Sequence, residues 1–369
     1  MADAGVSTES LAGADKMQGR ARKIRLAFIG CGAISEAHLA AYKNIPEVDV
    51  VAGADIKSDR LDWLREKHGV EAVFLDYRKM LEKVKPDAVD VCTPNGVHAS
   101  ATIASLNAGA HVITEKPMAM NPRECQAMVA AARKNKRKLA VGFQYRYHPA
   151  TQMIKRARDE GQFGNIMYVK CQALRRRGIP NWGVFGQKRL QGGGPLIDIG
   201  VHIIEAAHYI MGSPKPVAAT GNIWTYMGNK PNNVSVSWPN WDWKTYTVED
   251  LAIGHIRFAN GAVMQIESSF AAHIEKDTFN FSLIGDKGGA MWDPPSIFTD
   301  HCGTMVNVRP AFLENSDWVS QFLDKQRNFI HAIIGNSPLE APGEAGLAVQ
   351  KIIDGVYRSH AAGKEVRIS

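Results

Sequence analysis

The chain has 369 residues, of which 45% are hydrophobic and 22% charged, and its net charge is +7. This composition is that of an ordinary globular protein, and the length exceeds the size at which one hydrophobic core stops growing, so we expect two domains. Two basic runs, 133–138 and 175–177, are expected at a helix end and on a solvated strand. Neither has the interleaved aromatic residues typical of nucleic-acid binding, so no nucleic-acid partner is expected.

The five cysteines are odd in number and widely scattered, and no C-x-x-C pair occurs. They indicate neither a disulfide framework nor a zinc site, so no metal is expected. Residues 1–20 are polar and rich in Ala, Gly and Ser, and no stretch approaches the roughly 20 apolar residues of a membrane span. We therefore expect a cytoplasmic protein with a flexible extension over residues 1–22 and no membrane partner.

An apolar run at 24–29 leads into a glycine turn and then into a helical segment that ends at about Tyr42. Strand, glycine turn and helix in this order form the context of a dinucleotide-binding fingerprint. Gly30 allows the tight turn, and Gly32 lets the backbone approach a pyrophosphate at the helix N-terminus. The third fingerprint position is Ser35 instead of Gly or Ala. The turn residues expected to bind the cofactor are Gly30, Cys31, Gly32, Ala33 and Ile34.

The second expected strand, 48–54, ends at Asp55, about twenty residues after the turn, as the fingerprint requires. A carboxylate here accepts hydrogen bonds from the ribose 2′-hydroxyl and repels a 2′-phosphate, which favours NAD over NADP. Lys57, Ser58 and Arg60 follow closely and could soften that preference, so NADP is not excluded.

Strands and helices continue to alternate as far as residue 147, with further strands expected at 72–74, 88–92, 111–114 and 138–141. This pattern predicts an α/β Rossmann domain, a doubly wound parallel sheet, over residues 23–147. Ligands of such sheets bind beyond the carboxyl ends of the strands. The residues expected there to bind the cofactor are Thr93, Pro94, Asn95, His98, Glu115, Lys116 and Gln144.

After residue 148 the pattern changes to strands with few helices, and hairpin turns are expected at 259–261 and 286–289. We expect an α+β domain over 148–369, with a mainly antiparallel sheet and one helical layer. Its last helix, 343–362, and a short last strand are expected to return toward the first domain. A sheet covered on one side exposes apolar surface, so we expect a homo-oligomer.

A triple glycine, Gly192–Gly194, and Pro195 precede a buried helical pattern that carries Asp198 and His202. Proline suits the first turn of a helix, and residues four apart share one helix face. A carboxylate beside an imidazole on a rigid element is typical of an acid/base site. A capping aspartate and a satisfied core histidine would give the same pattern.

The segment 224–246 is rich in Pro and Asn and carries alternating tryptophans at 238, 241 and 243. Its aromatic faces could stack on a sugar ring or an aryl group, and a packing arm or a subunit contact is the alternative. The residues that we expect to contact substrate are Tyr145, Arg146, Trp182 and Trp241.

Three motifs occur in a characteristic order: the turn from Gly30 to Ser35, then Glu115-Lys116-Pro117, then the triple glycine with Asp198-x-x-x-His202. Together they resemble the glucose–fructose oxidoreductase / inositol dehydrogenase / rhizopine-catabolism (Gfo/Idh/MocA) family, over nearly the whole chain from about residue 24. The resemblance implies an NAD(P)-binding Rossmann domain, an open-faced sheet used for oligomerisation and substrates such as sugars and inositols. It also implies a catalytic group of Lys116, Asp198 and His202. The tryptophan-rich segment departs from the plain pattern, so no particular member's substrate is transferred.

The chemistry of these residues agrees with the resemblance. Oxidation of a secondary alcohol requires a base for the hydroxyl proton, a role that suits the imidazole of His202. The Lys116 cation would stabilise the developing alkoxide. We therefore expect an NAD(P)-dependent enzyme that oxidises a ring hydroxyl of a sugar, glycoside or cyclitol to a keto-sugar, such as a 3-keto glycoside. The alternatives are a glycosidase of the same family that uses transient oxidation, and a non-catalytic NAD or sugar sensor.

Overall fold

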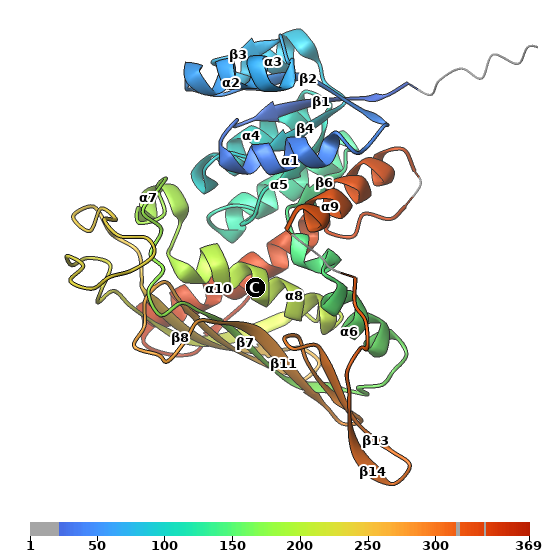
Figure 1. Ribbon diagram of the computed structural model, residues 1–369, viewed down its shortest axis with the longest axis vertical. Coiled ribbons are helices and arrows are strands. Elements are labelled where there is room, and N and C mark those ends of the chain that lie inside the picture. The colour runs from blue at the N-terminus through green and yellow to red at the C-terminus, as the bar shows by residue number, and fades with distance from the viewer. Residues whose placement is uncertain (1–21, 315–317, 336) are drawn as a thin grey trace, which may run out of the picture.

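The computed structural model describes residues 22–314, 318–335 and 337–369. All but the last residue of the expected extension at 1–22 lies outside these ranges. The described chain forms two sheets, drawn one above the other in Figure 1, with helices α8 (Val201–Ile210) and α10 (Gly343–Ala362) in the layer between them.

The first sheet has six strands in the order β3-β2-β1-β4-β5-β6, and every neighbouring pair is parallel. Its helices α1 to α5 alternate with the strands along the chain, which confirms the expected doubly wound Rossmann fold. The strands are β1 (Ile24–Ile29), β2 (Val48–Ala54), β3 (Val73–Phe74), β4 (Ala88–Val91), β5 (His111–Thr114) and β6 (Leu139–Val141). The helices are α1 (Ala33–Tyr42), α2 (Ser58–His68), α3 (Tyr77–Val84), α4 (Asn95–Asn107) and α5 (Pro122–Asn135).

The second sheet has nine strands in the order β14-β13-β12-β11-β7-β10-β9-β8-β15. Seven of its eight pairings are antiparallel, and β7 and β10 run parallel, so the expected mainly antiparallel sheet is confirmed. The turns at 259–261 and 286–289 join β9 to β10 and β11 to β12, as expected. The strands are β7 (Ile166–Leu174), β8 (Pro216–Trp224), β9 (Leu251–Phe258), β10 (Val263–Ser269), β11 (Thr278–Gly285), β12 (Gly289–Met291), β13 (Ser296–His301), β14 (Thr304–Val308) and β15 (Val366–Arg367).

Helices cover one face of this second sheet. Every residue of α8 is buried, and α10 lies across β8 and β9, where Val356 packs against Gly221 and Gly254. A Cβ at either glycine would come within 2.6 Å of Val356, so glycine is what lets the helix approach the sheet. Burial alternates along β9: Ala252 and Ile256 face the helices, while the side chains between them face outward. The remaining helices of this part are α6 (Pro149–Asp159) and the short α7 (Lys188–Gln191).

Helix α9 (Trp318–Ile333) was not expected from the sequence. It lies in the range 148–369, yet it packs against α1, as Figure 1 shows, and not on the second sheet. Its residues Phe329 and Ile330 are buried in the same cluster as Leu26 and Phe28 of β1. The late part of the chain therefore completes the core of the first sheet.

Helix α9 also carries a buried cation to the carboxyl edge of that sheet. Lys325 Nζ donates to Glu115 Oε1 at 2.7 Å, and His38 bridges Glu115 and Asp90 at 3.1 and 2.8 Å. Burial raises the pKa of the Glu115 carboxyl, but Lys325 and His38 outweigh it and hold that pKa well below its usual range. Burial lowers the pKa of His38, but Asp90 outweighs it and raises that pKa above 6.5. The two buried carboxyl groups are thus paired with Lys325 and His38.

Replacing Lys325 by Met keeps the length of the side chain but leaves the buried Glu115 without its principal cation. Breaking a buried ion pair from one side costs about 3–5 kcal/mol, so we expect a clear fall in melting temperature, measured by circular dichroism. Arg133→Ala, at the exposed Arg133–Glu344 pair, is the matched control and should cost less than about 1 kcal/mol. Equal melting temperatures for the two variants would contradict this account.

Candidate active site

The turn between β1 and α1 forms a cradle for a phosphate. Gly30 has φ +88°, and a Cβ there would lie 2.7 Å from the Cys92 carbonyl group of the neighbouring strand end. A Cβ on Gly32 would meet no atom within 4 Å, so this backbone faces open space at the N-terminus of α1. Ser35 Oγ donates to the Gly32 carbonyl at 2.6 Å and closes the turn. Open backbone at a helix N-terminus fits the pyrophosphate of NAD.

Asp55 holds this turn against the end of β2. Its carboxylate accepts from the Cys31 amide at 2.7 Å and from the Lys57 amide at 2.9 Å. A carboxylate offers about four acceptor positions, so two remain for the ribose hydroxyls. Arg60, which could soften the preference for NAD, donates to the Cys31 carbonyl at 2.6 Å and stacks on Trp63 at 4.3 Å.

Two more expected cofactor residues have contrasting environments. The ring nitrogens of His98 lie 2.8 Å from the carbonyl oxygens of Thr93 and Pro117, so His98 cross-links the loops that follow β4 and β5. Gln144 is buried in the 3₁₀ turn after β6 (Gln144–Tyr147), and its Oε1 has no hydrogen-bond partner among the described residues. A buried orphan acceptor at a strand end is suited to an amide donor of a ligand.

Lys116 connects the first sheet to the element that carries Asp198. Its Nζ donates to Asp198 Oδ1 at 3.1 Å and to the Asp198 carbonyl at 3.2 Å. The exposed fractions of the two side chains are 19% and 12%, so the pair is largely shielded but still reachable. The Lys116 amide donates to Glu115 Oε2 at 3.1 Å, which ties the strand end to the buried Lys325 network.

Asp198 lies in a π-helical turn (Leu196–Gly200) that continues directly into α8, where His202 is found. The continuous helix agrees with expectation, and the π-helical start is new; such turns are frequent at functional sites. Asp198 caps neither helix, and its carboxylate binds Lys116, so the capping alternative is wrong.

His202 is buried, and its ring meets the Tyr145 ring in an edge-to-face arrangement with the two centroids 5.2 Å apart. Its Nδ1 has no hydrogen-bond partner in the described part of the chain, so the alternative of a satisfied core histidine is wrong as well. Burial and, next, the positive charge of Lys116 lower the pKa of the imidazole well below 6.5. The ring is therefore neutral at pH 7 and able to take up a proton.

A second carboxylate shapes the triple glycine. Glu249, just before β9, accepts from the Gly194 and Leu196 amides at 2.9 and 3.3 Å and from the Tyr357 hydroxyl at 2.8 Å. A Cβ on Gly193 would lie 2.1 Å from that hydroxyl, and one on Gly194 would lie 2.2 Å from the Glu249 carbonyl. Glu249 and Tyr357 therefore set the start of the helix. Sequence spacing gave no signal for either residue.

Two residues expected at the substrate have internal roles instead. Arg146 is buried, pairs with Glu205 and the Glu340 carbonyl, and lies over the Tyr209 ring at 4.4 Å. Trp241 is also buried, and its Nε1 donates to the Gly228 carbonyl at 2.9 Å, which braces the tryptophan-rich segment from within. Sequence alone did not show these internal contacts, and contact of either residue with substrate stays a prediction.

The other aromatic candidates lie nearer the surface. Tyr145 packs on His202, and Trp182 is half exposed with its ring centroid 4.8 Å from that of Trp238. Arg175 was expected on a solvated strand, but it follows the end of β7 and is largely shielded, with its guanidinium 5.0 Å from the Trp238 centroid.

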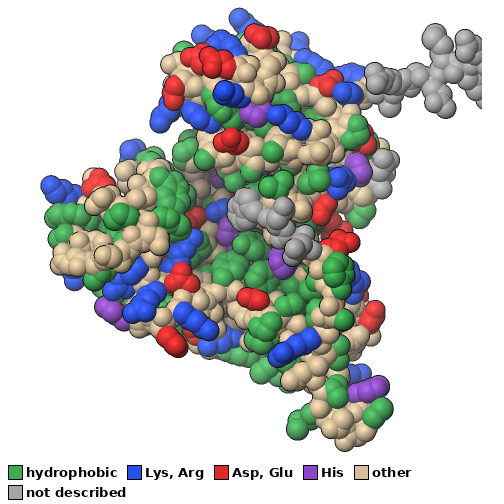
Figure 2. Space-filling model, in the orientation of Figure 1, with side chains coloured by type: hydrophobic (Ala, Val, Ile, Leu, Met, Phe, Trp, Pro, Cys, Tyr) green, Lys and Arg blue, Asp and Glu red, His purple; other side chains and the backbone are tan. Residues whose placement is uncertain are grey.

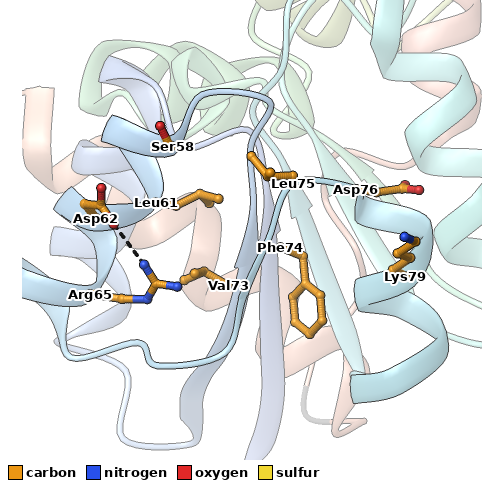
Figure 3. A pocket seen from close by; sticks show the side chains of 9 residues that line it. All are labelled: Ser58, Leu61, Asp62, Arg65, Val73, Phe74, Leu75, Asp76 and Lys79. Carbon is orange, nitrogen blue, oxygen red and sulfur yellow. Dashed lines mark hydrogen bonds and ion pairs between the residues drawn. The ribbon is translucent and has the colours of Figure 1, made fainter.

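A surface pocket of about 440 Å³ lies elsewhere, beside the edge strand β3 and between α2 and α3 (Figure 3). Its wall includes the Arg65–Asp62 ion pair at 2.8 Å, which the figure marks. None of its lining residues belongs to the Lys116, Asp198 and His202 group, so the pocket is separate from this site.

Family models match both parts of the chain: "Oxidoreductase family, NAD-binding Rossmann fold" over residues 24–143 and "Oxidoreductase family, C-terminal alpha/beta domain" over 155–368. The chain belongs to this Gfo/Idh/MocA oxidoreductase family and binds NAD in its Rossmann domain. It is 36% identical to the D-glucoside 3-dehydrogenase of Escherichia coli K12, over 94% of this chain and 97% of that one. It is 28% identical to the levoglucosan dehydrogenase of Pseudarthrobacter phenanthrenivorans, over 74% of each.

Solved structures share the fold. A levoglucosan dehydrogenase in complex with NADH and levoglucosan superimposes with a TM-score of 0.82 at 24% identity, and the match covers 94% of this chain and 100% of that one.

We expect His202 to remain neutral down to a pH below 6.5, because burial and Lys116 both disfavour the imidazolium. NMR titration of ring signals tests this, with the His202→Asn spectrum assigning the resonance. Lys116→Met removes the strongest of the positive charges that lower this pKa and should move the midpoint upward. A wild-type midpoint at or above 6.5, or a downward shift in the variant, would contradict the electrostatics described here.

Proposed function

We propose that this protein is an NAD-dependent dehydrogenase that oxidises a secondary ring hydroxyl of a glycoside or related sugar to a ketone. The observation that carries the proposal is the Lys116–Asp198 pair with the neutral His202, at the carboxyl edge of an NAD-binding sheet. The 36% identical relative is named for a D-glucoside and for position 3, which supports a glycoside substrate and oxidation at C3.

NAD, when bound, supplies the acceptor for the hydride that leaves the substrate carbon. The turn from Gly30 to Gly32 and the N-terminus of α1 would hold its pyrophosphate, and Asp55 would hold a ribose. We also assign Gln144 to this cofactor, because its Oε1 lies at a strand end and has no partner within the described ranges. The remaining chemistry falls to side chains of the chain itself.

In this proposal the neutral imidazole of His202 takes the proton of the reacting hydroxyl. The Lys116 ammonium donates a hydrogen bond to the same oxygen and stabilises the negative charge that develops there. Asp198 is the residue that holds the ammonium in place, through its carboxylate and its carbonyl oxygen. The lowered pKa of His202 keeps the ring in the unprotonated form that a base requires at neutral pH.

The two alternative functions have less support. The relatives described above are named as dehydrogenases, which favours net oxidation over a glycosidase that uses transient oxidation. A sensor needs no acid/base group, whereas the Lys116–Asp198 pair and a neutral His202 form one.

We expect folded Lys116→Ala to bind NAD but lose most of kcat, and His202→Ala to lose about 10²–10⁴-fold, the usual contribution of a positioned base. The kcat of the double variant should be little lower than that of the less active single variant, because the two residues act together. Initial rates of NADH formation with methyl and phenyl glucosides measure this, and Lys170→Ala, on the outer face of the second sheet, is the control. Near-native turnover in folded, NAD-binding variants would exclude the mechanism.

The proposal includes a cytoplasmic homo-oligomer. All five cysteines are free thiols and four of them are buried, which supports a reducing compartment. No helix in the described part of the chain is both long enough and apolar enough to cross a bilayer. The outer face of the second sheet exposes Met167, Ile253 and Ile284, which supports association through this face.

Light scattering at micromolar concentration is expected to give a mass of at least two chains. Ile253→Asp, which places a charge on the outer face, should shift the mass toward one chain. Leu75→Asp, an exposed position at the first sheet, should leave the mass unchanged. A wild-type mass of one chain would contradict the proposed association.

A further inference from the structure

Two tryptophans outside the acid/base group form a surface of their own. Trp182, after β7, and Trp238, in the tryptophan-rich segment, meet edge to face with their ring centroids 4.8 Å apart and their planes at 87°. The ring of Phe185 also meets that of Trp182 edge to face, with the two centroids 6.1 Å apart. Trp182 is still 50% exposed, which is unusual for an indole that has two aromatic neighbours.

This surface is built rather than incidental. Asn181 Nδ2 donates to the Pro239 carbonyl at 2.6 Å, so the neighbours of the two tryptophans are joined directly. The Asp250 carboxylate accepts from three successive amides at the start of the tryptophan-rich segment, Tyr226 to Gly228, and Trp241 braces it from within. The long loop is therefore pinned at its base and in its middle.

Arg175 connects this surface to the acid/base group. Its guanidinium lies 5.0 Å from the Trp238 centroid and 5.7 Å from that of Phe270. The Arg175 amide donates to the Ser269 carbonyl at 3.0 Å, and the adjacent Ser268 Oγ donates to the carbonyl of Pro195, which opens the Asp198 helix.

The charge of Arg175 also reaches the acid/base group. Burial lowers the pKa of its guanidinium, and the negative charge of Asp198 opposes that shift. Its positive charge is in turn among the influences that lower the pKa of His202. A guanidinium has five N–H donors, and the contact to the Gly178 carbonyl at 3.0 Å uses only one of its terminal nitrogens.

We propose that Arg175, Trp182 and Trp238 form a subsite for the second ring of a glycoside, the aglycone, beside the hydroxyl that is oxidised. The inference rests on the proposed function and specifies its substrate class: glycosides with a flat aglycone ring. Trp182 offers a rigid apolar face for that ring, and the N–H groups of Arg175 that have no acceptor among the described residues bind oxygens near the glycosidic bond. Figure 2 shows a hollow between the two sheets with apolar side chains along its wall.

The subsite predicts a difference between two glycosides with the same sugar. Phenyl glucoside should have a lower KM than methyl glucoside. Trp182→Ala and Trp238→Ala should each raise the KM for phenyl glucoside roughly three- to tenfold, the contribution of one aromatic contact, with the methyl glucoside changed less than about twofold. In both variants kcat should be kept, because the acid/base group is intact. Trp243 is exposed in the same segment, so Trp243→Ala is the matched control and should change the KM of neither glucoside.

Binding to the NADH-loaded protein, measured by calorimetry with the same two glucosides, separates the two proposals because it needs no turnover. Suppose that the wild-type protein oxidises both glucosides and that the variants leave the ratio of the KM values for phenyl and methyl glucoside unchanged. The subsite proposal is then overturned, and the proposal of a dehydrogenase stands. If no glucoside is oxidised, the proposed function fails. In that case the subsite is supported if phenyl glucoside binds and its binding weakens in Trp182→Ala. It is overturned if phenyl glucoside does not bind or if the variant binds it equally well. Circular dichroism and NAD binding confirm that each variant is folded.

Discussion

The ion pair between Lys116 and Asp198 is the contact on which the site depends, because it joins the two halves of the molecule at one point. Lys116 is at the end of a strand in the first sheet, and Asp198 is in the turn that opens the helix on the second sheet. An ammonium group and a carboxylate shielded from water attract each other more strongly the closer backbone and side chains hold them. Much of the surrounding structure serves to hold them close.

Each partner of the pair is positioned by a buried carboxylate. Glu115 accepts from the Lys116 amide and is kept ionised by Lys325, which arrives from α9 near the end of the chain. Glu249 accepts from the amides of the triple glycine and is bound by Tyr357 of α10. Both supports come from the last helices, so the C-terminal part of the chain stabilises an ion pair whose two residues lie earlier in the sequence.

The same strand start also organises the tryptophan-rich segment. Glu249 binds the start of the helix that carries Asp198 and His202, while its neighbour Asp250 binds the amides at the base of that segment. The helix of Asp198 and the aromatic surface are therefore both bound to the start of the same strand. This shared attachment limits how far they can move relative to each other. Such pre-organisation favours a substrate that contacts both regions at once.

Local patterns in the sequence determined the Rossmann sheet, the glycine turn with Asp55, the two hairpins and the helix with Asp198 and His202, since each depends on neighbouring residues and a fixed period. Strands β13 and β14 were not predicted because neither shows apolar alternation, and the side chains of β14 are mostly exposed. The tertiary structure alone decided that Asp198 binds Lys116, that Arg146 and Trp241 face inward, and that Lys325 and Glu249 support the site. Those contacts join residues tens to hundreds of positions apart, and no spacing rule relates such residues until the chain has folded.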